Sequence, residues 1–352
     1  MGLFQWLFKR LSEPRAADRA NTAETAAPPE ATVAVADPPG SAVEEEVGET
    51  WWSPRGATLT ELVEPDRPEL SPDARALENL LVSHFDGHDL SLPPLLSAAE
   101  RVLPILARKD YDVREVADAL AEDQVVAAAV LRMANSPLYR GVNKITTLPP
   151  AISRLGTRAL RMLLLHESMR SAMFHTRSEL HNQAQAIWQR AIASAAVMRG
   201  LAAFTGLDRD QAFLAGLLHD IGYVVVLRIT HEYAEAARFD IDIDEQTFEY
   251  LCYETHQEFG ELIGTAWSMP EPIQRIVADH HTYPDQNDPE RLMKIQLHLS
   301  DMIVSLLGYA PYAPYDLLES RPVSDLDLAQ KAKFIVYLQQ LPEQVDELIG
   351  SL

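Results

Sequence analysis

The chain contains one cysteine, few basic side chains for its length and no long apolar run. Cys252 has no second cysteine to pair with, so the sequence supports neither an internal disulfide nor a paired-cysteine metal site, and the cytoplasm is the expected location. Only 30 Lys and Arg stand against 52 Asp and Glu, which gives a net charge of −22. That field opposes contact with phosphate backbones, so we expect no nucleic-acid partner. No segment reaches the ~20 consecutive apolar residues of a transmembrane helix.

The N-terminal quarter differs in composition from the rest. Residues 12–75 are rich in Ala, Pro and Glu and are expected to form a disordered linker, because they bury too little apolar surface to offset their ordering entropy. Residues 1–11, MGLFQWLFKRL, form a short hydrophobic amphipathic segment. It could contact a membrane surface weakly, dock into a groove on a partner, or pack on its own domain. The Trp51-Trp52 pair is a second candidate docking point.

The rest of the chain has the periodicity of helices. Apolar residues recur at positions three and four apart, and strand-like alternation is nearly absent. The β-branched run at residues 223–227 follows Gly222 inside a helical context, so we predict helix there as well. The sequence predicts an all-α domain from about residue 76 to residue 352, preceded by a disordered tail. Helices are predicted at 95–106, 113–120, 125–133, 148–165 with a break at Gly156, 184–204, 209–221, 246–266 and 270–281. Gly206, Gly222 and Pro270 are the predicted breaks between the last four.

Imidazoles and carboxylates recur at the ends and faces of these helices. His219 and Asp220 close one apolar run, and His256, His280 and Asp301 follow in later segments. A single histidine beside an apolar helix is more often a hydrogen-bonded core residue than a ligand. Imidazole nitrogens and carboxylate oxygens together suit Zn, Mn, Fe or Mg, and a metal held there could activate water. The set is therefore typical of a hydrolase site.

The order of these motifs resembles that of a known protein superfamily. LLHDIG, then H-x-E-x-G, then HH and a later Asp resemble the HD superfamily of metal-dependent phosphohydrolases. The segments LSLPPLL, LAEDQVVAAAVLRMANSPLY and ITTLPPAISRLGTRALRMLLL are similar to the N-terminal half of one branch, the HDOD domain of bacterial signalling proteins. This resemblance implies an HD-like helical bundle with an N-terminal helical subdomain. The implied boundaries are 76–175 for the N-terminal half, 176–310 for the HD-like half and 311–352 for a C-terminal helical extension.

One position departs from the family pattern. In HD hydrolases the helix before HD carries the first metal-ligating histidine in a W-x-H-S-like context, and here that context is Trp188-Gln189-Arg190-Ala191. A guanidinium has no lone pair to donate and repels a cation. We therefore expect a degenerate metal site in which Arg190 pairs with Asp220 or Asp301 in place of a metal. His281 is the other predicted member of this degenerate site.

Three functions follow from these residues. The leading hypothesis is a non-catalytic signalling module that acts through protein–protein interaction with a signalling partner, with no catalytic residue and no cofactor expected. The alternative is a metal-dependent phosphodiesterase or phosphohydrolase with an incomplete ligand set. A third hypothesis is a nucleotide sensor. Other polar residues have simpler interpretations: Asp112 and Asp123 as helix caps, Cys252 as a small core residue, and Arg154, Arg158, Arg161 and Arg170 as a solvated basic face or an anion-binding surface.

Overall fold

The computed structural model describes residues 50–54, 57–85, 92–135, 139, 144–173, 180–237, 241–311, 313–329 and 332–351. The segment 1–11 and the predicted linker up to residue 49 lie outside the described residues. The chain from Trp51 onward forms one compact unit.

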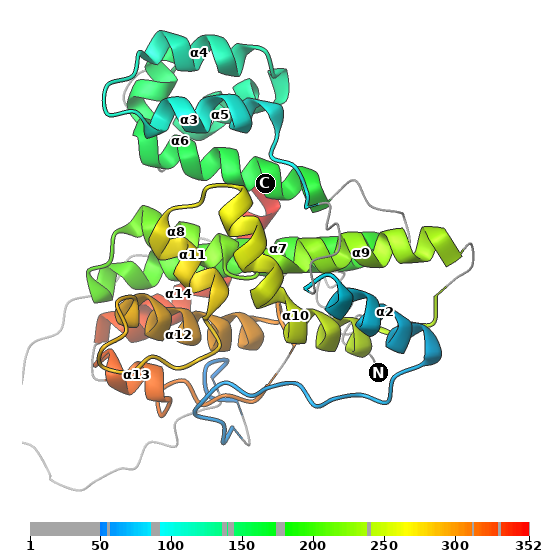
Figure 1. Cartoon of the computed structure of the whole chain (residues 1–352). Helices are drawn as coiled ribbons and strands as arrows, with labels where there is room; N and C mark the ends of the chain where they lie inside the picture. The colour runs from blue at the N-terminus through cyan, green and yellow to red at the C-terminus, as the bar shows by residue number, and fades with distance from the viewer. Residues whose placement is uncertain are drawn as a thin grey trace, which may run out of the picture. The chain divides into compact units, whose positions relative to one another are not determined.

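The regular elements of the described residues are helices, which confirms the all-α prediction (Figure 1). An isolated bridge of the β type joins Leu59 and Tyr315. The helices are α2 (Pro72–Ser83), α3 (Ser97–Ala107), α4 (Val113–Ala121), α5 (Gln124–Asn135), α6 (Leu148–Met173), α7 (His181–Thr205), α8 (Arg209–Leu218), α9 (Gly222–Ala237), α10 (Glu245–Ala266), α11 (Glu271–Ala278), α12 (Arg291–Leu307), α13 (Arg321–Asp325) and α14 (Ala332–Ser351).

Short polar residues and glycines set the helix ends. The Asp112 carboxylate accepts from the Arg114 amide at 2.8 Å, and Asp123 caps α5 in the same way, as predicted. Gly156 has φ 73°, ψ 174° and breaks α6 at the predicted position, and Gly206, with φ 80°, ends α7 in the left-handed conformation. The sequence therefore placed these turns correctly, because capping depends on neighbouring residues alone.

The N-terminal half has its own core. Helices α3, α4 and α5 pack against the first part of α6 around Val102, Leu120 and Val130. The second part of α6 leaves this core and joins the main one through Leu165 and Met169. Helix α6 therefore connects the two halves, as its position in Figure 1 shows.

The HD-like half is built on α7, α8, α9, α10, α11 and α12. The run Tyr223–Leu227 is helical in α9 and buried, so the tertiary context determines its conformation rather than its β propensity. Helices α8 and α9 together, Arg209–Ala237, are long and apolar enough to cross a membrane, but 83% of their most apolar window is buried, as in a core helix of a globular protein. Helix α2 packs on α9 and α10 through Leu77 and Leu81, so it belongs to this half and not to the N-terminal half that the boundary at residue 76 implied.

The folded part of the chain begins before residue 75, the predicted end of the linker. Residues 57–71 run in an extended path along the body before α2 starts, so the part of the 12–75 prediction that lies in the described chain is wrong. The Trp51 indole N–H donates to the carbonyl of Leu338 in α14 at 3.2 Å, and Trp52 packs beside it. This tryptophan pair therefore docks on its own C-terminal extension. A sequence rich in Pro and Glu gives no periodic signal for such an extended segment.

Candidate functional site

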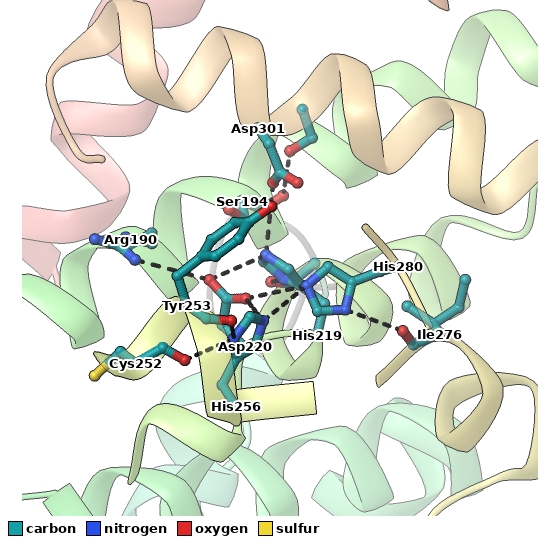
Figure 2. A network of polar contacts seen from close by, with 12 residues as sticks. Arg190, Ser194, His219, Asp220, Cys252, Tyr253, His256, Ile276, His280 and Asp301 are labelled. Atoms are coloured by element: carbon teal, nitrogen blue, oxygen red, sulfur yellow. Dashed lines mark hydrogen bonds and ion pairs between the residues drawn. The ribbon is translucent and has the colours of Figure 1, made fainter. Parts of the chain in front are cut away.

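The predicted site residues converge from four segments of the helical body, and Figure 2 shows their side chains turned toward one another. His219 and Asp220 form the turn between α8 and α9, and His256 lies on α10. His280 follows the end of α11, and Asp301 lies on α12. All five residues lie within one cluster, which we call the HD cluster. The spacing of these residues in the sequence does not show that α12 lies next to α8. The packing of the helices brings the two together.

The carboxylate of Asp220 lies at the centre of the HD cluster. Its Oδ1 lies 3.3 Å from Nε2 of His256 and 3.3 Å from Nε2 of His280. Its Oδ2 lies 3.3 Å from Nε2 of His219, which is in turn 3.5 Å from Oδ1 of Asp301. Three imidazoles therefore present the same ring nitrogen to one carboxylate.

Backbone carbonyls fix the orientation of these rings. Nδ1 of His219 contacts the Gly216 carbonyl at 2.9 Å, and Nδ1 of His280 contacts the Ile276 carbonyl at 3.1 Å. Nδ1 of His256 contacts the Cys252 carbonyl at 2.9 Å. A carbonyl oxygen can only accept, so each Nδ1 carries a proton, and a ring that is neutral has its lone pair at the Nε2 that faces the cluster. The same arrangement orients histidines that bind metals in proteins.

The HD cluster therefore has more acceptors than donors at its centre. Nε2 of His256 and Nε2 of His280 are 3.2 Å apart, and both face Oδ1 of Asp220. Buried acceptors at such distances need a proton or a cation between them. In the metal-free cluster the proton belongs on His219: although burial opposes its charge, the carboxylates of Asp220 and Asp301 raise the pKa of His219 to about 9. Burial likewise opposes the ionised form of Asp220, but the positive charge of His219 and the hydrogen bond from its ring hold the pKa of Asp220 well below the usual range.

The pKa values of the remaining titratable groups shift so that each group favours its neutral form. Burial raises the pKa of the Asp301 carboxyl to about 7 against the attraction of His219. Burial lowers the pKa of His280 to about 4, and the positive charge of His219 adds to this effect. Burial and the neighbouring imidazoles lower the pKa of His281, which stacks on the Tyr253 ring at 4.3 Å, to about 2. At neutral pH the cluster therefore holds its positive charge on His219.

Arg190 lies beside the HD cluster, but its main partner differs from the prediction. Nη2 of Arg190 donates to Oε2 of Glu249 at 2.7 Å, whereas its Nη1 is 4.0 Å from Oδ2 of Asp220 and no ion pair with Asp301 forms among the described contacts. The guanidinium also lies 5.0 Å from the centroid of the Tyr223 ring. The pairing with Asp220 is thus the minor one, and Glu249 neutralises most of the guanidinium charge.

The sequence analysis missed Glu249 and Tyr223. Glu249 stands seven residues before His256 on α10, a spacing of about two helical turns that places both on one face. That spacing could have indicated the residue. Tyr223 gave no comparable signal, because its ring reaches the site through the start of α9. Cys252 is fully buried, in agreement with its interpretation as a core residue.

A pocket of about 550 Å³ opens next to the HD cluster. Arg190, His219 and Asp220 lie on its floor side, and the extended residues 61–66 form part of its wall. Six carboxylates line this pocket, and the lining guanidinium is that of Arg190. A field of this sign disfavours a nucleotide, which gives no support to the sensor hypothesis. The lining acids are Glu61, Glu64, Asp66, Asp220, Glu249 and Asp301.

The donor chemistry of the HD cluster fits a divalent metal. Two overlapping triads, His256–His280–His281 and His219–Asp220–His280, bring potential ligand atoms within 4.8 Å of one another. Fixed Nε2 lone pairs and a carboxylate are ligands that Zn, Mn and Fe accept. Arg190 contributes no ligand to this set.

Two of the four arginines in the predicted basic face are paired with nearby acids. Arg158 contacts Asp208 at 2.5 Å, and Arg170 donates to Glu167 at 2.7 Å. These contacts give no support to a dedicated anion site on α6.

Comparison with known proteins identifies the family. The helical fold and the HD cluster define a protein of the HD type, and the model of the HDOD domain matches residues 92–283. The chain belongs to the HDOD domain family. Its fold is related to HD-type phosphohydrolases and to signal transduction proteins.

Solved structures share this fold at low identity. A provisionally named metal-dependent phosphohydrolase from Shewanella amazonensis SB2B is 19% identical with a TM-score of 0.61, covering 78% of this chain and 100% of its own. An HDOD domain protein of unknown function from Geobacter sulfurreducens is 22% identical with a TM-score of 0.56, covering 78% and 98%. A provisionally named signal transduction protein from Marinobacter aquaeolei VT8 is 20% identical with a TM-score of 0.53, covering 80% and 66%.

A curated relative of uncharacterised function comes from Treponema pallidum (strain Nichols). It is 23% identical over 271 residues, which is 72% of this chain, and this chain spans about 50% of the length of that relative.

Proposed function

We propose that the chain is a non-catalytic HDOD module that acts in bacterial signalling, in the cytoplasm, through contact with a partner protein. The observation that carries the proposal is the position of Arg190, whose side chain is 8% exposed and held by Glu249 at 2.7 Å. The guanidinium stands 4.0 Å from the Asp220 carboxylate, where the family resemblance places a metal-ligating histidine. The site thus loses a ligand and gains a fixed positive charge.

The charge of Arg190 opposes a metal on Asp220. Two unit charges 4 Å apart repel by on the order of 4 kcal/mol at an effective dielectric constant of 20, and a divalent ion doubles that figure. Glu249 offsets part of this repulsion because it contacts the same guanidinium. In this proposal His219, His256, His280 and Asp220 form a hydrogen-bonded polar core that fixes the packing of α8, α10 and α11. The helical exterior is then the part that meets the partner.

Metal analysis tests the non-catalytic proposal. The full chain, purified without chelator, is examined for Fe, Mn, Zn and Mg by mass spectrometry, and we expect well under one ion per chain. One tightly held ion per chain would contradict the proposal. A second measurement concerns binding of the partner. A protein captured by the full chain should bind the His219→Ala variant as tightly as it binds the wild type. Loss of that binding with an unchanged circular dichroism spectrum would also contradict it.

A metal-dependent phosphohydrolase is the second candidate, favoured by the three Nε2 atoms that converge on Asp220. His219, Asp220, His256, His280 and Asp301 would hold a divalent metal, which when bound would supply Lewis acidity toward a phosphate ester. Arg190 would orient an anionic oxygen of the substrate, and the side chain of Tyr253 would limit the access of water to the site. Hydrolysis of bis(p-nitrophenyl) phosphate with added Mn²⁺ tests this candidate. It requires activity in the wild type that His256→Gln abolishes and that Arg158→Ala, a variant outside the site, retains.

A further inference from the structure

Residues 57–66 lie in an extended conformation next to the pocket, and we call them the strap. Six consecutive strap residues, 61–66, line the same pocket as His219, Asp220 and Asp301. An extended chain without regular pairing has few contacts to offset its ordering entropy.

The strap is fixed firmly at its first residues. The carbonyl of Leu59 accepts from the Asp316 amide at 3.0 Å, and the carbonyl of Thr60 accepts from the Arg321 amide at 3.0 Å. Leu59 also forms a parallel bridge with Tyr315. These bonds hold the strap against the segment between α12 and α13.

A second attachment follows the strap. Nη2 of Arg67 donates to Oε1 of Glu78 on α2 at 2.9 Å, and its guanidinium lies 5.7 Å from the Tyr250 ring centroid on α10. The stretch between Thr60 and Arg67 is thus attached to the body at each of its two ends.

Within this stretch Leu62 packs against the hydrophobic cluster shared by α7, α12 and α14, and the other contacts are weak. The Val63 amide donates to the Tyr315 hydroxyl at 3.4 Å, and the Val63 side chain is 48% exposed. Glu61 and Arg321 form an ion pair of 3.4 Å between side chains that are 63% and 50% exposed. Exposed pairs of this kind contribute little to stability. Few contacts and high exposure are the properties of segments that open locally while the rest of a protein stays folded.

The strap also contributes charge to the pocket. Glu64 lines the same pocket as Tyr253 and His281, whose rings stack on each other, and burial together with the Glu64 carboxylate raises the pKa of Tyr253 to about 12. Glu61, Glu64 and Asp66 supply half of the six lining carboxylates. While the strap is seated it therefore narrows the pocket and adds negative charge at the entrance.

We propose that residues 61–66 act as a detachable cover: they restrict access to the HD cluster while seated and expose it when they detach. Residues 61–66 lie between the attachments at Thr60 and Arg67 and include the exposed Val63, so a partner that binds them directly can change access to the site. This inference goes beyond the proposed function and holds whether or not the site binds a metal.

Hydrogen exchange on the full chain tests whether the strap detaches. We expect the Val63 amide, which donates to the Tyr315 hydroxyl, to exchange at least ~100-fold faster than the amides of α12. The amides of Asp316 and Arg321, which hold Leu59 and Thr60, should exchange more slowly than the Val63 amide, because residues 61–66 open while this attachment stays closed. If the Val63 amide instead exchanges as slowly as α12, the strap opens only by global unfolding, and the proposal is wrong.

Chemical access to His281 tests whether the strap covers the pocket. Diethyl pyrocarbonate modifies imidazole nitrogens, and the site of modification is determined by mass spectrometry. Replacing residues 61–66 with Gly-Ser-Gly-Ser-Gly-Ser keeps the attachments at Leu59 and Arg67 while removing the side chains and increasing chain entropy. We expect His281 to react roughly 10-fold faster in this variant, with His231 on α9, outside the pocket, as the internal reference whose rate stays constant.

Tyr315→Phe provides a milder version of the same change. It removes the acceptor of the Val63 amide and keeps the ring, so we expect a smaller acceleration in the same direction, about 2- to 5-fold. An unchanged His281 rate in both variants, with His231 also unchanged, means that the seated strap does not restrict the pocket and overturns the proposal. A rise at His231 as large as that at His281 reports general loosening of the fold and also overturns it.

Discussion

The guanidinium Nη1 of Arg190 lies 4.0 Å from Oδ2 of Asp220, while Nη2 of the same group bonds Glu249 at 2.7 Å. One cation is thus shared unequally between a carboxylate of the HD cluster and a carboxylate on α10 beside it. Whether the site binds a metal therefore depends on the charge of Arg190 as well as on the number of ligands. Removing Arg190 alone would leave the Glu249 carboxylate without its partner, so any test has to change both residues.

The first prediction concerns metal binding. Arg190→His with Glu249→Gln supplies an imidazole, removes the guanidinium and avoids an unpaired buried carboxylate. We expect this double variant to bind about one Mn²⁺ or Zn²⁺ per chain and to gain several degrees in Tm when either ion is added. Thermal denaturation with and without metal measures this gain. The matched control, Glu249→Gln alone, keeps Arg190 and should gain nothing; an equal gain in the control would show that Arg190 does not limit metal binding.

The second prediction concerns the contact between α9 and α10. A Cβ atom at Gly222 would clash with the backbone carbonyl of His256, and backbone atoms cannot move aside as a flexible side chain can. Gly222→Ala should lower the free energy of unfolding by about 3 kcal/mol or more. Gly264→Ala on α10 is the control, because its Cβ would meet the Gln274 side chain at an ordinary 3.6 Å and it replaces glycine within a helix. Urea denaturation should find this control equal to or slightly more stable than the wild type.

The third prediction concerns pH. In the folded, metal-free protein the pKa of His219 is raised to about 9, above its value of about 6.5 in the unfolded chain. The stabilisation is therefore complete below about pH 6.5 and is lost as the pH rises through 9. We expect the free energy of unfolding, measured with chelator present, to fall by up to about 1 kcal/mol per pH unit between pH 7 and pH 9.

His219→Gln is the control for the pH prediction. Glutamine keeps a polar side chain but does not titrate, so the slope between pH 8 and pH 9 should be smaller in this variant than in the wild type. His280, with a pKa lowered to about 4, titrates below the window, whereas Asp301, with a pKa raised to about 7, titrates at its lower edge, so the comparison is made between pH 8 and pH 9. A slope that persists in His219→Gln would assign the titration to another group.

The fourth prediction concerns the boundary of the folded unit. Trp51 packs beside Trp52 and its indole donates to the Leu338 carbonyl on α14. Trp51→Ala should lower the free energy of unfolding by about 1–2 kcal/mol, since it loses a partly buried ring and a hydrogen bond. Val336→Ala on the same helix, where the side chain is 49% exposed, should change it by less than about 0.5 kcal/mol. Similar losses in both variants would contradict docking of Trp51 on α14.

The site shows how far sequence reasoning extends into three dimensions. His219, Asp220, His256, His280 and Asp301 could be selected from residue type and motif order, and the structure brings them together around one carboxylate. The partner of Arg190 could not be selected, because Asp220, Asp301 and Glu249 are all acids on segments that face the same interior. Which acid lies 2.7 Å away depends on how α7 and α10 pack.

The sequence by itself determined the helical class, the helix ends at Gly156 and Gly206, the caps at Asp112 and Asp123, and the membership of the HD cluster. These features depend on local conformational preference or on a motif, so neighbouring residues specify them. Only the tertiary structure decided that the segment before α2 lies along the body as the strap, that α2 belongs to the HD-like half, and that Glu249 holds Arg190. Each of these depends on contacts between residues far apart in the chain, which no local pattern of charge or hydrophobicity specifies.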